Sequence, residues 1–515
     1  MKEPDLTDVA SPGPRDVLAT WLLPALTLIL QLATYAGYGY FRDELYYLAN
    51  GEHLGFGYVE HPPLIGVIAA LVRATLGESL FAIRLLPAIA AAATVFLAGA
   101  IARELGGGRF AQVLAGLCVM LAPAMLGVFG VLTMNAFDIL AWAALWWLVA
   151  RYLRTGQDRL WLWFGIVAGI GLENKISVLF LGFGIVAGLA VCRRWGAFRS
   201  RWLWIGGGLA GLLLLPHALW QVANGWPTLE FMRNAIAEKN VAFSPGGYVA
   251  AQSLNTFPAL PVWLAGLALL LTGRSARRFR PLGWAYLAIL GVMLTTNAKP
   301  DYLLPAYTVL FAAGGVALER LRPRVVRAVA RGAAVVFLIG SGVALAPFAK
   351  AILSEDTFVR YEHALGVKPP QGERQTLGRL PQHFADMHGW PELAEAVSHV
   401  FQGLPPADQA RVCIFAGNYG EAGAIDLFGP RHGLPKAISG HNSYFLWGPR
   451  GCTGEVMIVI GGRRDELASH FASVDLGATF TCTDCMPYEN DKPIWVVRGL
   501  EQPMTAVWPR VKHYI

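Results

Sequence analysis

Carboxyl groups gather in one polar stretch between two apolar stretches near the start of the chain. Asp43 and Glu44 stand side by side after Arg42, and Glu60 follows with His61 in a Glu-His-Pro-Pro sequence. Neighbouring carboxyl groups at a boundary between water and lipid can divide their tasks, because their surroundings decide which one is ionised at the working pH. We predict that Asp43, with Glu44 beside it, serves as a general base. The alternative is an interfacial polar cluster within an aromatic belt.

Two later polar sites also interrupt apolar stretches. Lys175 follows Glu173 between two short apolar runs, and Lys299 precedes Tyr302 in the same way. An unpaired charge within hydrocarbon costs roughly 2.5–3.5 kcal/mol on insertion scales, so such residues tend to face a cavity or a partner. A lysine can alternatively reach the interface with its long side chain. Three polar clusters on one predicted membrane face favour a shared anion site, in which cations hold a phosphate group and a carboxyl group faces a nucleophile.

The composition indicates which kind of secondary structure positions these residues. Of 515 residues, 55% are hydrophobic and only 15% are charged, and the mean hydropathy is +0.44. A soluble protein would carry about a quarter charged residues. Disorder, a collagen-like fibre and a small disulfide-stapled domain are excluded, and an α-helical polytopic membrane protein remains. The net charge of +7 comes from arginine groups at predicted membrane edges, so we predict membrane lipid and no nucleic acid as a partner.

The apolar stretches predict eleven transmembrane helices. About 20 apolar residues are needed to cross about 30 Å of hydrocarbon. The predicted spans are 18–38, 80–102, 110–127, 131–150, 160–172, 176–192, 202–222, 257–272, 282–297, 303–319 and 333–350.

The positive-inside rule orients these spans. With the N-terminus in the cytoplasm, the inner segments hold 20 Lys and Arg residues and the outer segments before residue 351 hold seven. The prediction is therefore a cytoplasmic segment 1–17, a multi-spanning domain 18–350 with a first outer loop at 39–79, and a small extracytoplasmic α/β domain at 351–515. We expect a cell (inner) membrane protein whose C-terminal domain lies on the periplasmic side.

The cysteines of the C-terminal domain fit an oxidising compartment. Cys452, Cys482 and Cys485 lie there, and we predict a disulfide between Cys452 and either Cys482 or Cys485. The Cys-Thr-Asp-Cys sequence leaves a redox site or half of a zinc site as alternatives. Cys413 is expected in a buried strand.

Five segments in order resemble the polyprenyl-phosphate-sugar glycosyltransferases of the dolichyl-phosphate-mannose–protein mannosyltransferase type, which include the bacterial aminoarabinose transferases that modify lipid A. The resemblance covers roughly residues 20–320. The segments are RDELYYLA (42–49), YVEHPPLIGVIAAL (58–71), TMNAFDILAWAALWWLVARYL (133–153), GIGLENKISVLFL (169–181) and KPDYLLPAYTVL (299–310). The resemblance implies the GT-C fold and an active site on the outer membrane face.

The resemblance also implies roles for individual residues. Asp43 matches the first-loop aspartate regarded as catalytic, so it would accept a proton from the acceptor oxygen as that oxygen attacks the anomeric carbon with inversion. The expected partners are a polyprenyl-phosphate-linked sugar donor and an extracytoplasmic acceptor, which is a lipid, a protein or a glycan. The residues expected to bind the donor phosphate or lipid-linked sugar are Arg42, Glu60, His61, Arg84, Lys175, Lys299 and Tyr302; secondary candidates are Tyr46, Asn135 and Asp138.

Some positions depart from the family pattern. His61 stands where the family has a lysine, and an imidazole with an unperturbed pKa of about 6.5 is no permanent cation. No cofactor is firmly indicated; a divalent metal is left open, with Glu60 and His61 as conceivable ligands. The rival hypotheses are a transporter or flippase that binds lipid-linked sugars without catalysis, and a membrane scaffold. The sequence shows no internal repeat of the kind many transporters have.

Overall fold

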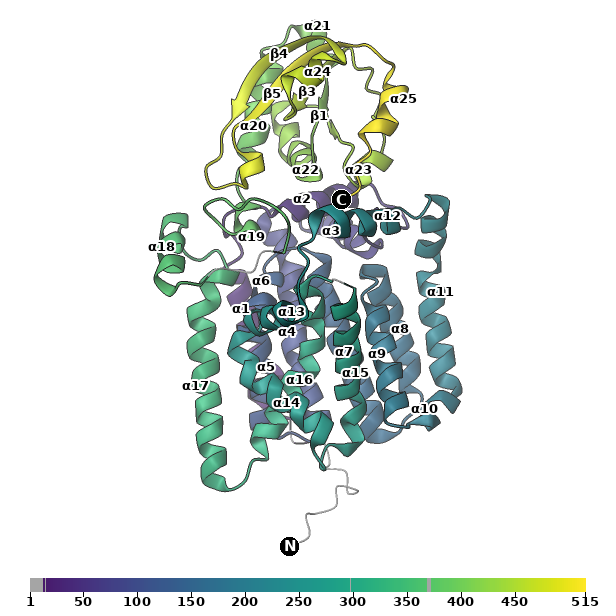
Figure 1. Ribbon diagram of the computed structural model, residues 1–515, viewed down its shortest axis with the longest axis vertical. Helices are drawn as coiled ribbons and strands as arrows, with labels where there is room; N and C mark the ends of the chain where they lie inside the picture. Colours follow the sequence, from purple (N-terminus) through teal and green to yellow (C-terminus); the bar gives the residue numbers. More distant parts are fainter. Residues whose placement is uncertain (1–12, 14, 297, 368–371) are drawn as a thin grey trace. The chain divides into compact units, whose positions relative to one another are not determined.

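The chain forms two compact units in the computed structural model (Figure 1), which describes residues 13, 15–296, 298–367 and 372–515. The first unit comprises Met1–Tyr35, Arg84–Leu219 and Ala242–Ile352, and the second comprises Ala36–Ile83, Trp220–Val241 and Leu353–Ile515. The predicted start of the C-terminal domain, residue 351, lies close to the last of these divisions. The first outer loop, which the sequence assigns to the membrane domain, packs instead with the C-terminal residues.

The first unit is a bundle of apolar helices. Its elements are η1 (Leu18–Leu22), α1 (Leu23–Ala33), α4 (Leu80–Glu104), α5 (Arg109–Leu121), α6 (Pro123–Val128), α7 (Met134–Thr155), α8 (Leu160–Asn174), α9 (Val178–Val191), α10 (Trp195–Arg199), α11 (Arg201–Ala223), α13 (Pro245–Asn255), η3 (Phe257–Ala259), α14 (Leu260–Thr272), η4 (Arg277–Phe279), α15 (Arg280–Thr295), η5 (Pro300–Ala306), α16 (Tyr307–Glu319) and α17 (Arg324–Ala349). Each predicted span coincides with one helix or with two consecutive ones.

Five helical segments among the described residues are long and apolar enough to cross a membrane, and a bent pair formed by α13 and η3–α14 would make six. The count of eleven spans stays a prediction, because several of the helices are shorter than the hydrocarbon thickness requires. The predicted span 110–127 illustrates the reason. It divides into α5 and α6 at Ala122, whose extended backbone precedes Pro123, as expected of a residue before proline.

Glycines allow the helices of this unit to approach closely. A Cβ atom at Gly188 of α9 would collide with the carbonyl oxygen of Pro281 at the start of α15, and one at Gly314 of α16 would collide with that of Val262 in α14. Small residues have this role in membrane helix pairs, where close packing replaces the hydrophobic driving force available in water.

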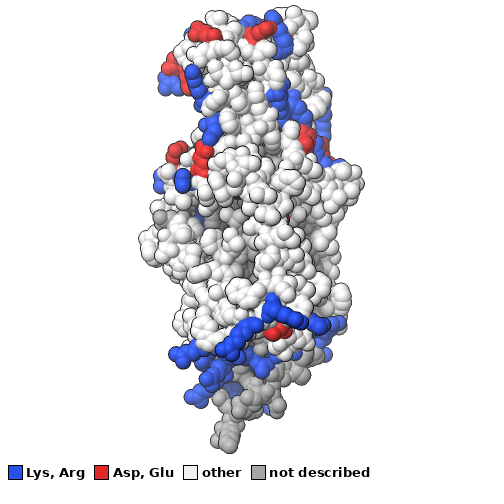
Figure 2. All heavy atoms as spheres, turned by 90° about the vertical axis from the view of Figure 1, so that its right-hand side faces the viewer, with Lys and Arg blue, Asp and Glu red and all other residues white. Residues whose placement is uncertain are grey.

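The loops predicted to face the cytoplasm contact one another. Arg278 donates to the carbonyl oxygen of Arg154 at 2.8 Å, and Arg320 donates to that of Gly106 at 2.8 Å. These bonds join segment 274–280 to 151–159 and segment 320–331 to 103–109. An ion pair between Arg154 and Glu104 links the two pairs, so the four loops lie at one end of the bundle. Figure 2 shows Lys and Arg side chains gathered at one end of a band that carries few charges, as positive-inside asymmetry predicts.

The second unit contains a five-stranded sheet with the order β2-β1-β3-β5-β4. β1 (Cys413–Phe415) pairs in parallel with β2 (Ala437–Ile438) and β3 (Val456–Ile460), while β5 (Lys492–Leu500) pairs antiparallel with β3 and with β4 (Phe471–Phe480). The remaining elements are α2 (Arg42–Glu52), α3 (Leu64–Thr75), α12 (Pro227–Asn234), η2 (Ala235–Lys239), α18 (Glu355–Leu365), α19 (Gln382–Ala385), α20 (Trp390–Gln402), α21 (Pro406–Gln409), α22 (Tyr419–Phe428), η6 (Gly429–His432), α23 (Ser443–Leu446), α24 (Arg464–Ala468), η7 (Pro487–Glu489), α25 (Met504–Val507) and η8 (Trp508–Val511).

Two predictions for this domain need correction. The predicted disulfide between Cys452 and Cys482 or Cys485 is wrong, because the structure pairs Cys413 with Cys452 and Cys482 with Cys485. Because β1 pairs in parallel with β3, Cys413 lies close to Cys452, which precedes β3. The prediction treated Cys413 as an ordinary buried strand residue and did not consider it as a disulfide partner. The sequence RDELASHFASV (464–474) has a helix-like pattern, which predicts a helix over this stretch, but it forms only the short α24 before β4 begins at Phe471.

Candidate functional site

The start of helix α2 fixes the two neighbouring carboxyl groups in different surroundings. Phe41 has an extended backbone, and its N–H donates to Glu44 Oε2 at 2.8 Å, which satisfies a donor that the helix itself cannot use. Glu44 is fully buried. Its carboxyl group therefore caps the helix, and this placement gives no support to its predicted part in proton transfer.

Asp43 has a more open carboxyl group. Its Oδ1 accepts a hydrogen bond from the Tyr419 hydroxyl at 2.8 Å and lies 3.7 Å from Arg42 Nε. Its side chain is 30% exposed, and Oδ2 takes part in no hydrogen bond among the described residues. One oxygen of Asp43 is thus held in place while the other is free to accept a proton, which is the geometry that a general base requires.

Arg42 braces this arrangement from the buried side. Its Nη1 donates to the Tyr488 hydroxyl at 2.6 Å and lies 3.6 Å from Asp386 Oδ1, and its guanidinium carbon lies 5.3 Å from the centre of the Tyr419 ring. Burial raises the pKa of Asp386 to about 6, against the opposing effect of Arg42. Arg42 was predicted to bind the donor phosphate. Its guanidinium group instead contacts side chains of the second unit, so these contacts give no support to that prediction.

Glu60 is the second carboxyl group near Asp43. The Tyr46 hydroxyl donates to Glu60 Oε2 at 3.0 Å and accepts from the Ser443 N–H at 3.2 Å. Burial raises the pKa of Glu60 to about 8; the hydrogen bond from Tyr46 lowers it, and the charge of Asp43 raises it further. At neutral pH Glu60 therefore keeps its proton.

His61 has a structural position. It is buried, with Nδ1 2.8 Å from the Pro62 carbonyl oxygen and Nε2 3.1 Å from Asn50 Nδ2. A carbonyl oxygen only accepts, so Nδ1 carries the proton, and Nε2 accepts from the amide. The ring is then neutral, and these contacts occupy both nitrogens. This geometry supports neither phosphate binding nor metal binding by His61.

In the first unit, three other predicted residues, Asn135, Asp138 and Tyr302, lie around Lys175. Its ammonium group donates to Asn135 Oδ1 at 2.6 Å, lies 4.0 Å from Asp138 Oδ2 and sits 4.7 Å from the centre of the Tyr302 ring. Asp138 is buried and accepts from the Ser177 hydroxyl at 2.5 Å. Segments 134–138, 174–177 and 299–302 therefore meet, as their common predicted membrane face requires. Of the three N–H donors on the ammonium group, one is used by Asn135.

The other predicted cations have weaker ties to this cluster. Lys299 lies directly before η5, and its carbonyl oxygen accepts from the Tyr248 hydroxyl at 3.4 Å. Arg84 is buried at the start of α4 and donates to the Tyr35 carbonyl oxygen, which ties α4 to the end of α1. Asp43 belongs to the second unit, and Lys175 and Lys299 belong to the first. Their meeting in one pocket stays a prediction.

Several residues that hold the two clusters were missed. Tyr419, Tyr488 and Asp386 support Asp43 and Arg42 across more than 300 residues of sequence. In the first unit, Gln252 donates to the Pro300 carbonyl oxygen at 2.7 Å and accepts from Tyr307 at 3.1 Å, which positions η5. No local sequence motif identifies these residues. Gln252 could have been noticed as a polar side chain in an otherwise apolar helix.

No three His, Cys, Asp or Glu side chains are grouped so as to hold a metal ion in the part of the chain that the structure describes.

The fold is similar to those of known membrane glycosyltransferases. The structure of ArnT from Cupriavidus metallidurans bound to undecaprenyl phosphate has a TM-score of 0.62 and 15% identity, covering 94% of this chain and 98% of that one. Its apo state has a TM-score of 0.60 and 16% identity, covering 92% and 97%. The arabinofuranosyltransferase AftD from Mycobacteria has a TM-score of 0.52 and 14% identity, covering 96% of this chain and 41% of that one.

These similarities show that the chain has the GT-C fold. In addition, residues 60–220 match the model of the dolichyl-phosphate-mannose-protein mannosyltransferase family. The family resemblance and the fold class predicted from the sequence are thereby confirmed. No curated protein sequence matches the chain.

Proposed function

We propose that the protein is an integral membrane glycosyltransferase that moves a sugar from a polyprenyl-phosphate donor to an extracytoplasmic acceptor, with inversion. The observation that carries this proposal is the state of Asp43, whose Oδ1 is held by Tyr419 while Oδ2 is open. The undecaprenyl phosphate bound to the similar ArnT structure supports a lipid-linked donor. The acceptor classes that we retain are a lipid, such as lipid A, a protein and a glycan.

In the proposed reaction, an acceptor hydroxyl oxygen attacks the anomeric carbon of the donor sugar. The bond between this carbon and the phosphate oxygen breaks, polyprenyl phosphate leaves with the electron pair, and Asp43 Oδ2 takes the hydroxyl proton. Glu60, which keeps its own proton because burial raises its pKa to about 8, does not compete for that proton at neutral pH. Tyr419 is a positioning residue.

We assign donor-phosphate binding to Lys175, with Lys299 as a second cation. Asn135 and the Tyr302 ring fix the direction of the Lys175 ammonium group and leave N–H donors for an oxyanion. The carboxyl group of the buried Asp138 lies 4.0 Å from this ammonium group. In this proposal Asp138 orients the lysine and has no part in proton transfer.

The test uses the full-length protein in vesicles, supplied with a panel of polyprenyl-phosphate sugars and with lipid, peptide or glycan acceptors. Release of free polyprenyl phosphate that depends on the acceptor measures transfer. D43N should lower the rate by at least about 10²-fold, the lower end of the range for general-base catalysis. E52Q removes an acid from the same helix and should leave the rate within twofold of the wild type.

A transporter or flippase would move the donor without cleaving it. Movement of intact donor across the vesicle membrane without release of polyprenyl phosphate would therefore replace the transferase proposal with this alternative. Normal turnover by D43N would remove Asp43 from the mechanism while leaving the transferase assignment in place.

A further inference from the structure

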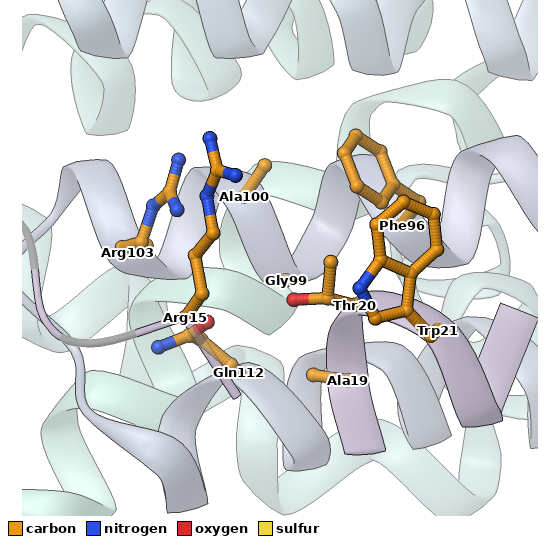
Figure 3. A pocket seen from close by; sticks show the side chains of 9 residues that line it. All are labelled: Arg15, Ala19, Thr20, Trp21, Phe96, Gly99, Ala100, Arg103 and Gln112. Carbon is orange, nitrogen blue, oxygen red and sulfur yellow. The ribbon is translucent and has the colours of Figure 1, made fainter. Parts of the chain in front are cut away.

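A pocket of about 120 Å³ lies in the first unit, and no residue assigned to sugar transfer lines it (Figure 3). It is formed by the segment that leads into α1 and by helices α4 and α5. Arg15 and Arg103 line it, with Gln112 beside them, and the aromatic rings of Trp21 and Phe96 line it at the other side. The small residues Ala19, Gly99 and Ala100 leave the space between them.

The two arginines of this pocket carry positive charge that the described residues do not neutralise. Neither Arg15 nor Arg103 forms an ion pair within the described part of the chain, and Arg103 Nε is buried without a hydrogen-bond partner. The adjacent acids serve other groups. Asp16 accepts from the Leu18 N–H at 2.9 Å at the start of η1, and Glu104 pairs with Arg154.

Two neighbouring guanidinium groups destabilise the folded protein when no anion is present, and they stabilise it when an anion binds between them. Two like charges repel each other, and a buried donor without a partner costs about 1–3 kcal/mol. The side-by-side guanidinium groups in Figure 3 present several N–H donors in the same direction, the arrangement that binds the oxygens of a phosphate. A pocket of about 120 Å³ has room for a group as small as a phosphate.

The apolar wall indicates that the phosphate belongs to a lipid. Trp21 is 67% exposed and Phe96 is 41% exposed, and both belong to segments that adjoin the hydrocarbon region. Exposed Trp residues at the end of a membrane helix are typical of the interface. A free phosphate ion would leave both rings without a partner, whereas an acyl chain would cover them.

We propose that this pocket binds the phosphate head group of an anionic membrane lipid between Arg15 and Arg103, with the adjoining acyl chain along Trp21 and Phe96. The site lies on residues 15–21 and on the end of α4 that leads into loop 103–109, one of the four loops that gather at the arginine-rich end of the bundle. Basic pockets between membrane helices bind lipid head groups in this way. The lipid is a structural ligand, separate from the sugar donor.

The test measures thermal unfolding of the detergent-solubilised full-length protein during titration with dioctanoyl phosphatidylglycerol. A ligand of the folded state raises the unfolding midpoint with a concentration dependence that gives an apparent Kd. The wild type should show a saturable increase. Dioctanoyl phosphatidylcholine, which carries no net charge, and inorganic phosphate, which has no acyl chain, should each bind at least tenfold more weakly.

Three variants test the residues. R15Q/R103Q should weaken phosphatidylglycerol binding at least tenfold, whereas R199Q/R324Q, which removes two exposed arginines of other predicted cytoplasmic segments, should bind as the wild type does. A100L fills the pocket without changing charge and should also weaken binding at least tenfold; it decides the matter if the double variant does not fold.

The proposal is overturned if R15Q/R103Q or A100L binds phosphatidylglycerol with wild-type affinity. Equal binding of phosphatidylcholine would remove the role of the charge, and equal binding of inorganic phosphate would remove the role of the lipid; either result overturns it. Sugar transfer is not measured, so neither outcome bears on the proposed transferase activity.

Discussion

Replacing Glu60 by Gln should change how the stability of the protein depends on pH. Burial raises the pKa of this carboxyl group from 4.5 to about 8 in the folded protein, with Tyr46 lowering and Asp43 raising it. Below pH 4.5 the group is protonated whether the chain is folded or unfolded. Between pH 4.5 and 8 the unfolded chain ionises while the folded chain keeps its proton, so the free energy of unfolding falls as the pH rises. Above about pH 8 the dependence levels off.

The size of this effect follows from the pKa difference. One pKa unit corresponds to about 1.4 kcal/mol, so the change from 4.5 to about 8 corresponds to at most about 5 kcal/mol. Since Glu60 is partly exposed, solvent screening reduces this figure. E60Q has no ionisable group at this position and retains a partner for the Tyr46 hydroxyl. Its stability relative to the wild type should therefore increase from pH 5 to about pH 8 and level off above that pH.

The assay is thermal unfolding of wild type and E60Q in detergent at pH values from 5 to 9. Asp386 and Glu489, whose pKa values burial raises to about 6 and about 8, affect both proteins alike and cancel in the difference. E52Q is the control. Burial acts to raise the pKa of Glu52, but hydrogen bonds from Lys436 and Arg73 outweigh it and lower the pKa, so Glu52 is ionised in both states throughout this range and its difference from wild type should stay constant.

A difference between E60Q and wild type that is the same at pH 5 and pH 9 would refute the reasoning. It would mean that Glu60 is hydrated in the folded protein and does not keep its proton at neutral pH.

The other predictions concern transfer and topology. Y419F removes a hydrogen bond to a carboxylate, which is worth about 1.5–3 kcal/mol, and should lower kcat about 10- to 150-fold with an unchanged KM for the donor. K175M should instead raise the donor KM at least tenfold, and K299A should impair donor use more than acceptor choice; unchanged donor kinetics would exclude phosphate binding at that lysine. A reporter fused after Ile515 should be active outside the cytoplasm, and cytoplasmic activity would reverse the predicted topology.

The sequence predicted the helical bundle well because each span is a local property. An apolar run of the right length forms a helix whatever its neighbours are, so every predicted span corresponds to helical structure. The predicted grouping of loops also follows from local information. Successive spans cross the membrane in opposite directions, so every second loop lies at the same end of the bundle. The hydrogen bonds from Arg278 to Arg154 and from Arg320 to Gly106 bear out this grouping.

The C-terminal pairings could not be predicted in the same way. Which cysteine bonds to which depends on the order of strands in the sheet, and the parallel neighbours β1 and β3 are separated by helix α22 and strand β2 along the chain. Short strands such as β1 leave little pattern from which to derive this order. The sequence therefore indicated an oxidising compartment and disulfide formation without the correct partners.

The candidate site shows the same division between local and distant information. Residue type and spacing selected Asp43, Asn135, Lys175 and Tyr302, and the last three meet around one ammonium group. What separates Asp43 from Glu44 is invisible in the dipeptide. Glu44, the third residue of the helix, accepts a hydrogen bond from the N–H of Phe41, which precedes the helix, and is buried there. Asp43, the second residue, instead accepts a hydrogen bond from the hydroxyl of Tyr419, 376 residues away. In the proposed mechanism, helix geometry thus selects the proton acceptor, and Tyr419, a residue that no motif near Asp43 indicates, positions it.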